Sequence, residues 1–331
     1  MSRSSGNRRG VALSLSNMGE VHSRRGNFDQ ALRCLEEALS IHRELGIRRT
    51  IAITLGNMGA VYGRRGNHDQ ALRYFDESLW LSRELGDRRA TAHALNNVGM
   101  VNYERGDYDK ALRYYDEAFQ IFQELGDRSG IATVVGNMGI VHNDRGRPEQ
   151  ALQCFDQTLS IRRELGDRPM IGWSLCKIAG VHADRGDWAE AKKTALQAQK
   201  VSRSGGRREF LSESLSVLCR AHAALGRWQA SLSSGAEAAS IADETQHWML
   251  MITCRLALSQ SRLCMARWFD EGQREGQRPP LSRQAAIAEA TDYAKQAREL
   301  AEVSGMKGYV KKADELLARV EEVSRAEGSA D

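Results

Sequence analysis

The apolar residues between positions 50 and 84 follow two successive helical patterns. The first helix, over 50–65, has packing residues spaced i, i+3, i+4 and i+7 on one stripe: Leu55, Met58, Gly59 and Tyr62. The second, over 68–84, presents small, large and small residues at helical spacing: Ala71, Phe75 and Ser78. Gly66 and Asn67 lie between the two helices and predict a turn, because glycine accepts left-handed dihedral angles without strain. This stretch therefore predicts a pair of packed helices.

Glycine and aspartate mark where these helices approach each other and where they end. Gly59 costs a helix about 1 kcal/mol relative to alanine, so its place on the packing stripe predicts that the second helix crosses close by. Gly86 is expected to end the second helix. The aspartates that follow the Leu-Gly pairs are expected to be N-caps of the next helices: Asp87, Asp127 and Asp167.

The same unit returns along the chain at intervals of 40 residues. Asn-Met-Gly at 17–19 recurs at 57–59 and 137–139, and as Asn-Val-Gly at 97–99. The turn glycine keeps the same interval: Gly26, Gly66, Gly106, Gly146, Gly186 and Gly226. A fixed period of this length predicts stacked helix-turn-helix units, each of which contacts only its neighbours.

This unit resembles the tetratricopeptide repeat in its 40-residue form. Gly59 and Tyr62 match the small residue and the aromatic residue of the family's first helix, and Ala71, Phe75 and Ser78 match its second helix. The Leu-Gly-Asp-Arg-Arg linker and the Asn-Met-Gly core are most similar to Pins-type G-protein-modulator scaffolds, and more distantly to kinesin light chain and bacterial peptide-sensing regulators. The resemblance implies an all-α, right-handed superhelical solenoid of about seven such units with a C-terminal capping helix. It also implies a non-catalytic adaptor for a partner protein.

The register of the repeat predicts the organisation of the chain. Residues 1–6 are expected to be a disordered N-terminus, 7–305 the repeat array, 306–326 a polar capping helix and 327–331 a tail. The repeats are expected at 7–45, 47–85, 87–125, 127–165, 167–205, 207–245 and 247–305. The last repeat contains an insertion near 270–284, where Gly272, Gly276, Pro279 and Pro280 predict a loop or helix extensions.

Composition narrows the class of protein. The 331 residues include 47 Lys and Arg and 43 Asp and Glu, and the pI near 8.7 lies below the value of about 9 that marks a strong nucleic-acid footprint. The six cysteines form no Cys-x-x-Cys pair, and no apolar run of about 20 residues predicts a membrane span. These features argue against nucleic-acid binding and predict a cytoplasmic protein with reduced thiols.

A row of asparagines is the main candidate for a binding site. Asn17, Asn57, Asn97 and Asn137 are predicted to lie on the first helices, opposite the packing stripe, with parts of the wall bared by Gly56, Gly63 and Gly136. A side-chain amide both donates and accepts hydrogen bonds, so the row could hold the backbone of an extended or helical peptide in a concave groove. The asparagines that these four resemble in Pins-type scaffolds help hold an extended partner. The alternative is that each amide joins neighbouring helices within the scaffold.

Other residues are assigned to the same groove. Arg24 and Arg64 lie at its N-terminal end and Glu104 further on, a polarity that would steer the acidic part of a ligand toward the first two repeats. The remaining predicted peptide-binding residues are His93, Met100 and Tyr103. The alternative is that Arg24, Arg64 and Glu104 are solvated charges at the rim of the groove. The arginines that recur beside the turn glycine, such as Arg65 and Arg105, are interpreted as charge compensation at helix C-termini.

No catalytic or metal-binding motif is present in the sequence. The recurring histidines at 22, 142, 182 and 222 are interpreted as half-buried packing groups, because equivalent positions of successive repeats lie too far apart to share a metal ion. We therefore predict no metal, no cofactor and no enzymatic activity. Two alternatives to the peptide-binding adaptor stay open. One is a homo-oligomeric scaffold that assembles through the uncapped N-terminal repeat or the Trp- and Met-rich C-terminal repeats. The other is a peptide-sensing regulatory subunit.

Overall fold

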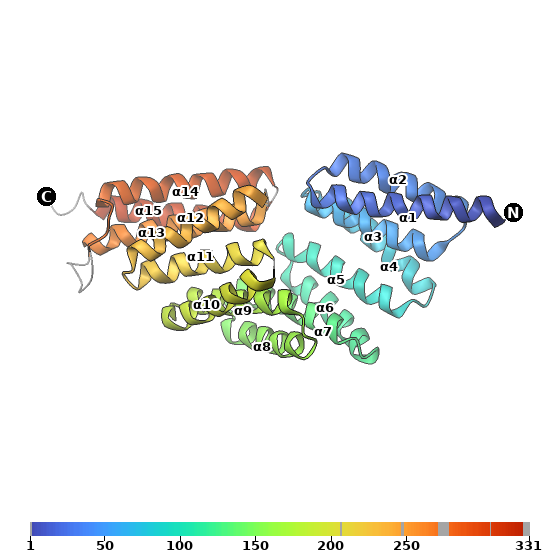
Figure 1. Ribbon diagram of the computed structural model, residues 1–331, viewed down its shortest axis with the longest axis horizontal. Coiled ribbons are helices and arrows are strands. Elements are labelled where there is room, and N and C mark those ends of the chain that lie inside the picture. The colour runs from blue at the N-terminus through green and yellow to red at the C-terminus, as the bar shows by residue number, and fades with distance from the viewer. Residues whose placement is uncertain (1, 206, 246–247, 271–277, 305, 327–331) are drawn as a thin grey trace. The chain divides into compact units, whose positions relative to one another are not determined.

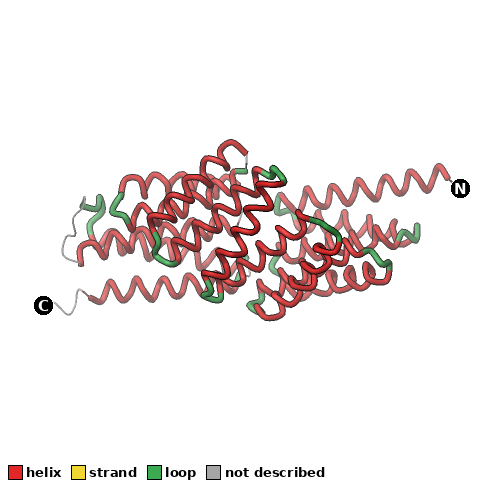
Figure 2. Tube along the Cα trace, turned by 90° about the horizontal axis from the view of Figure 1, so that it is seen from below, coloured by secondary structure: helices red, strands yellow, loops and turns green. Residues whose placement is uncertain are grey.

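The computed structural model describes residues 2–205, 207–245, 248–270, 278–304 and 306–326, and the side chains of residues 2–6, Arg24 and Lys307 are not part of that description. The described residues form helices with no strand (Figures 1 and 2). The helices are α1 (Ser2–Arg24), α2 (Phe28–Glu44), α3 (Arg48–Arg64), α4 (His68–Glu84), α5 (Arg88–Glu104), α6 (Tyr108–Glu124), α7 (Arg128–Asp144), α8 (Pro148–Glu164), α9 (Arg168–Asp184), α10 (Trp188–Gly205), α11 (Arg208–Ala224), α12 (Trp228–Thr245), α13 (Trp248–Asp270), α14 (Arg283–Val303) and α15 (Lys307–Arg325). The all-α fold class is confirmed.

The turns form as the sequence predicts. Gly66 and Gly86 adopt φ angles of +79° and +63°, which side chains with a Cβ atom rarely accept. Asp87 accepts a hydrogen bond from the backbone N–H of Ala90 at 3.0 Å, and the other two predicted N-caps, Asp127 and Asp167, accept equivalent bonds. The turns and N-caps of each helix pair are therefore formed by residues of the repeat itself.

The first of two compact units comprises Met1–Val141. Within it, α1 packs on α2, α3 on α4 and α5 on α6, and neighbouring first helices touch, α1 with α3 and α3 with α5. The predicted close crossing is present: a Cβ atom on Gly59 would lie 2.8 Å from Cδ1 of Phe75. In the next repeat, a Cβ atom on Gly99 would lie 2.7 Å from Cε1 of Tyr115. The glycines on the packing stripe thus make room for the large residue of the second helix.

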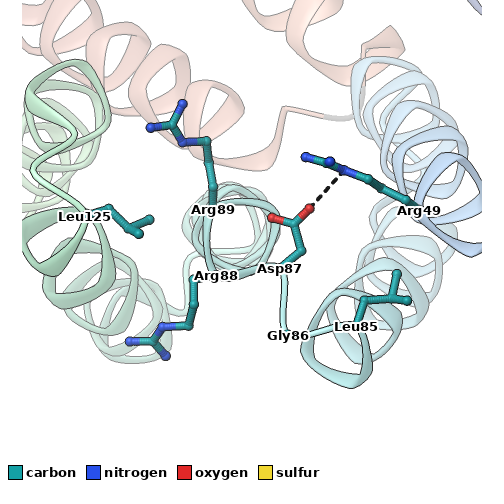
Figure 3. Close-up of a pocket in the computed structure, with 7 residues that line it drawn as sticks. All are labelled: Arg49, Leu85, Gly86, Asp87, Arg88, Arg89 and Leu125. Carbon is teal, nitrogen blue, oxygen red and sulfur yellow. Dashed lines mark ion pairs between the residues drawn. The ribbon is translucent and has the colours of Figure 1, made fainter.

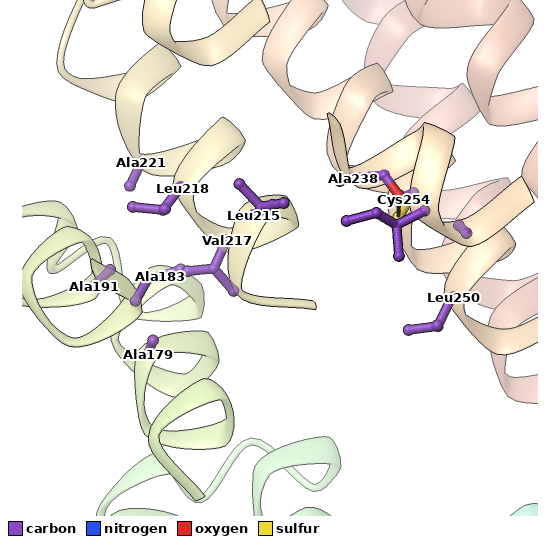
Figure 4. Close-up of a cluster of buried hydrophobic side chains, with 13 residues drawn as sticks. Ala179, Ala183, Ala191, Leu215, Val217, Leu218, Ala221, Ala238, Leu250 and Cys254 are labelled. Carbon is purple, nitrogen blue, oxygen red and sulfur yellow. Dashed lines mark hydrogen bonds between the residues drawn. The ribbon is translucent and has the colours of Figure 1, made fainter. Parts of the chain in front are cut away.

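The second unit comprises His142–Asp331. Its core draws on α9 to α13, and Figure 4 shows how small residues such as Ala179 and Ala191 allow the helices to approach the larger Leu215 and Leu218. Residues 271–277 of the predicted insertion lie outside the described residues. On either side of them, α13 and α14 have 23 and 21 residues, compared with 17 in α3 to α9.

The last helix, α15, packs on both α13 and α14. Four of its apolar residues are almost fully buried: Ala313, Leu316, Val320 and Val323. Near its start, Lys312 places Nζ 3.0 Å from Oδ1 of Asp144, which lies 168 residues earlier in the chain. Lys177 of α9 forms a similar ion pair with Glu213 of α11 at 3.2 Å. Charged side chains therefore join α15 to the last residue of α7, and α9 to α11.

Ion pairs also connect successive repeats at the turn arginines. Arg65 and Arg105 are the C-cap residues of α3 and α5, and each reaches an aspartate in the first turn of an earlier helix. Arg65 lies 2.8 Å from Asp29, and Arg105 lies 2.9 Å from Asp69. These arginines thus bridge neighbouring repeats through exposed pairs, each of which contributes about 0–1 kcal/mol.

Candidate binding surface on the first helices

The four predicted asparagines lie near the middle of α1, α3, α5 and α7. Asn17 is exposed, whereas Asn57, Asn97 and Asn137 are half-buried. Only Asn137 fits the reading in which the amide ties helices together: its Nδ2 donates to Oδ1 of Asn96 at 2.8 Å, from α7 to α5. The amide of Asn137 is therefore partly used within the scaffold.

The other three asparagines, which we call the amide row, have no such bond. Within the described part of the chain, no hydrogen bond joins the side chains of Asn17, Asn57 or Asn97 to another residue. None of their amide atoms belongs to the buried side-chain atoms that lack a hydrogen-bond partner. The three amides therefore face solvent on α1, α3 and α5, and they retain both donor and acceptor capacity.

Large apolar side chains accompany the amide row. Leu13 and Ile53 occupy the same repeat position, one helical turn before Asn17 and Asn57, and they are 60% and 51% exposed. Met100, three residues after Asn97, is 36% exposed. Of the glycines expected to bare the wall, Gly56 and Gly63 are half-buried. Gly136 is buried, so the prediction was wrong for that residue: it packs inside the scaffold.

The predicted charged residues make contacts within the first unit. Arg64 donates from Nη1 to Oγ of the buried Ser23 at 3.0 Å. Oε2 of Glu104 lies 3.4 Å from Nδ1 of His68 at the start of α4. The side chain of Arg24 lies outside the described residues. Arg64 thus also joins α3 to α1, whereas the contact between Glu104 and His68 is not a hydrogen bond, and the steering role of both residues stays a prediction.

His93 and Tyr103 lie against aromatic neighbours. The ring of His93 meets Phe122 of α6 edge-on, with 5.1 Å between the ring centroids. Although His93 is exposed as a whole residue, the water lost from around its ring lowers the pKa of His93 below the ordinary value. The His93 imidazole is therefore neutral at pH 7 and offers a hydrogen-bond donor and an acceptor, one helical turn before Asn97. Tyr103 is half-buried beside Tyr108, at 5.9 Å between the ring centroids.

A separate hollow of the first unit contains none of the predicted site residues. It lies beside the turn from α4 to α5 and is lined by Arg49, Leu85, Gly86, Asp87, Arg88, Arg89 and Leu125 (Figure 3). Its charges are paired: Arg49 contacts Asp87 at 3.1 Å and Arg89 contacts Asp127 at 3.5 Å. The hollow is thus a crevice between successive turns whose charged groups already have partners.

One exposed aromatic residue was missed by the sequence reasoning. Trp80 on α4 is 59% exposed. The same repeat position carries a polar residue in the neighbouring repeats, Ser40, Gln120 and Ser160, and that contrast is the signal that could have singled it out. Trp80 lies on a second helix and is not part of the amide row.

Comparison with known protein families identifies the family of the chain. The tetratricopeptide repeat family matches residues 10–79, 50–124 and 130–204, which together make up more than half of the chain. The chain belongs to the tetratricopeptide repeat family. No curated protein sequence matches it.

Several solved structures share the architecture of this tetratricopeptide repeat protein. Aspartyl phosphate phosphatase F from Bacillus subtilis is 13% identical, with a TM-score of 0.71 over 92% of this chain and 73% of that one. The Rap conjugation gene regulator of the plasmid pLS20, in complex with the Phr* peptide, is 17% identical, with a TM-score of 0.63 over 86% and 74%. BtubC (BKLC) from P. vanneervenii is 21% identical, with a TM-score of 0.53 over 60% and 83%. At these identities the likeness shows the fold alone.

The tetratricopeptide repeat array offers little for metal chemistry in the part that is described. No group of three or more His, Cys, Asp or Glu side chains is placed to hold a metal ion among these residues. The four recurring histidines are half-buried in their packing positions, as predicted. Likewise, none of the described helices is both long and apolar enough to cross a membrane.

Proposed function

We propose that this tetratricopeptide repeat scaffold binds an extended segment of a partner protein across α1, α3 and α5. The observation that carries the proposal is the amide row, three asparagines at one repeat position whose amides face solvent without a protein partner. Water satisfies these amides in the unbound chain, so what supports a partner from outside is that the same open amide recurs on three successive first helices.

The surroundings of the amide row fit a peptide. The amides of Asn57 and Asn97 can donate to a peptide carbonyl and accept from a peptide N–H, which holds the backbone without reading its sequence. Leu13, Ile53 and Met100 supply apolar contact area beside them. Burial of apolar side chains on both partners would contribute most of the affinity, and the amides would set the direction and register of the peptide.

The test compares two kinds of asparagine in one assay. Peptides are selected by display against the full chain, and the affinity of the best binder is measured for Asn57→Ala/Asn97→Ala and for Asn137→Ala. We expect the double variant to bind at least tenfold more weakly with an unchanged melting temperature, because its amides have no scaffold partner. Asn137→Ala should instead lower the melting temperature, because it leaves Asn96 without its bond. Full affinity in the double variant would rule out the amide row.

A second candidate function, self-assembly, is favoured by the outer face of α1. Val11, Met18 and Val21 are 44%, 49% and 47% exposed there. At the same repeat positions, Met58 and Val61 are 1% and 2% exposed, because the preceding repeat covers them. A second copy of the chain could cover this face of α1. Light scattering on Met18→Glu/Val21→Glu and on the unaltered chain tests it; a monomer in both samples at high concentration contradicts self-assembly.

A peptide-sensing regulatory subunit is a finer version of the first proposal. It is supported only by fold, since a structural neighbour binds the Phr* peptide. A conformational response of the chain on binding a selected peptide would separate a sensor from a passive adaptor. Hydrogen exchange of α7 to α15 with and without the peptide measures that response, and unchanged exchange would leave the adaptor.

A further inference from the structure

We propose that a hollow between α12, α13 and α14 binds a carboxylate group on an aliphatic stem, with Arg262 as its anchor. The hollow has a volume of about 250 Å³ and belongs to the second unit. It shares no residue with the amide row, so the proposal stands independently of peptide binding.

The anchor is a buried arginine that is only partly satisfied. Arg262 is 7% exposed, and its Nε donates to Oε2 of Glu289 at 2.7 Å. Its Nη1 is buried and has no hydrogen-bond partner among the described residues. No hydrogen bond is found for Nη2 either, and Nη2 is not one of the buried unsatisfied atoms, so it is open to solvent. Nη2 is thus open to an acceptor, and the buried Nη1 beside it has none.

Such an incomplete set of bonds is costly for a buried cation. A buried donor without an acceptor loses its hydration without replacement, and the loss is larger for a charged group. A carboxylate matches the planar guanidinium better than a single oxygen acceptor does, because its two oxygens can accept two parallel hydrogen bonds. An incoming carboxylate would therefore complete the bonding of Arg262.

The rest of the hollow supplies a second donor and an apolar wall. Tyr293 lies under the guanidinium, with Cζ of Arg262 5.6 Å from the ring centroid, and no hydrogen bond joins its hydroxyl to another described residue. Leu232, Ala236 and Leu258 line the same hollow. An aliphatic stem would contact these side chains while the charged end reaches Arg262.

The other charges of the hollow are already paired. Arg255, one lining residue, donates from Nη2 to Oδ1 of Asp243 at 2.9 Å and from Nη1 to the carbonyl of Met251 at 3.3 Å. Asp243 is thereby neutralised by Arg255. Glu289 takes one nitrogen of Arg262 and leaves the other two. The charged groups of the hollow that remain without a partner are therefore hydrogen-bond donors, which suit an anion.

The hollow of Figure 3 provides an internal contrast. It too is lined by arginines and leucines, but Arg49 and Arg89 both have carboxylate partners. Their side chains are 74% and 63% exposed, compared with 8% for Arg262. An exposed, paired arginine gains little from another carboxylate, whereas the buried and incompletely bonded one gains a great deal.

The experiment titrates hexanoate and hexanamide into the full chain and follows binding by calorimetry and by the melting temperature. The two probes have the same shape and differ in charge. We expect hexanoate to bind with a dissociation constant on the order of 1 mM, and to raise the melting temperature at concentrations well above that value. Hexanamide should bind at least tenfold more weakly. Equal binding of both probes, or of neither, overturns the proposal, and this comparison needs no variant.

Two variants locate the site. Arg262→Met keeps the length of the stem and should abolish hexanoate binding, while Arg267→Met, on the same helix but outside the hollow, should bind as the unaltered chain does. Hexanoate binding retained by Arg262→Met would place the site elsewhere and contradict the assignment. Circular dichroism melts report whether each variant folds.

A third probe distinguishes the two sources of such a carboxylate. It is a terminally blocked pentapeptide, Ala-Leu-Glu-Leu-Ala, whose only carboxylate is the glutamate side chain. Tighter binding of this peptide than of hexanoate would indicate an acidic side chain of a partner protein. Tighter binding of hexanoate would indicate a small organic acid, and both results support a carboxylate site at Arg262.

Discussion

The same repeat position carries different chemistry in the two units of the chain. In the first unit it holds Asn57 and Asn97, whose amides have no protein partner. In the second unit it holds Lys177, which is paired with Glu213 at 3.2 Å, then Val217 and Ala257, which are 9% and 4% exposed. The backbone scaffold is shared, but only the first unit leaves polar groups open at this position.

This contrast distinguishes positions that stabilise the fold from positions that are open to a partner. Ion pairs such as Lys177–Glu213 and Lys312–Asp144 satisfy the charges of the second unit within the chain. Buried residues at the same positions contribute to its core. The open amides of the first unit form no internal bond, and their recurrence at one repeat position supports the proposal that a partner binds there. Substitutions at one repeat position should therefore have different consequences in the two units.

The largest expected effect concerns what the two units have in common. Gly99→Val would push a side chain toward Tyr115, and Gly235→Val would do the same toward Leu258, where a Cβ atom would lie 2.6 Å from Cδ2. Overpacking of this kind should lower the free energy of unfolding by about 2–3 kcal/mol in both variants. Chemical denaturation followed by circular dichroism measures the loss.

The control for this prediction is Gly63→Ala. The nearest side-chain atom to a Cβ atom there is 3.9 Å away, so the substitution fits without strain. Because alanine is the better helix former, stability should rise by up to about 1 kcal/mol. A loss confined to only one of Gly99→Val and Gly235→Val would show that the two units do not share this packing.

A smaller effect should distinguish the two units. Lys177→Met leaves Glu213 without its cation, and the two side chains are only 28% and 20% exposed, so the free energy of unfolding should fall by about 1–2 kcal/mol. Asn57→Ala, at the same repeat position, removes no internal bond and should change it by less than about 0.5 kcal/mol. Thermal melts of both variants measure the difference, and equal losses would break the contrast between the units.

The smallest effect is a pH dependence within the first unit. Burial, and next the nearby Arg9, lower the pKa of His42 below its ordinary value of about 6.5, so the folded state prefers the neutral ring. Well above pH 6.5 both states are neutral and His42 contributes no pH dependence. Below it the unfolded state binds the proton first, so stability falls as the pH drops toward the folded pKa.

His42→Ser tests this contribution, because Ser82 is buried at the same position of the next repeat. Melts between pH 7.5 and 5 should show a shallower loss in the variant, by less than about 1 kcal/mol over the range. His93 and His222, whose pKa values are lowered in the same direction, remain in both samples. An identical slope in the two samples would mean that His42 is not desolvated.

Most of the helical framework could be predicted because each repeat carries its own signals. The second helix expected over 68–84 is α4, His68–Glu84, bounded by Asn67 and the left-handed Gly86. The crossing at Gly59 and Phe75 follows from spacing within one repeat. Local signals of this kind need no knowledge of the distant chain.

The candidate sites could be predicted only in part, since they depend on contacts between repeats. No sequence rule indicates that Asn137 would bond Asn96 while Asn97 stays open. The pairing of Lys312 with Asp144 joins residues 168 positions apart, and the open nitrogens of Arg262 are visible only once Glu289 is placed. Side-chain partners across such distances are set by packing geometry rather than by periodicity.

The most direct test of the central claim is a double-mutant cycle between Asn97→Ala and N-methylation of single peptide bonds in a selected binding peptide. If the amide of Asn97 holds the peptide backbone, the two changes should be coupled by about 0.5–1.5 kcal/mol at one peptide bond and be additive at the others. Additive effects at every peptide bond would contradict the claim that the amide row binds a partner's backbone.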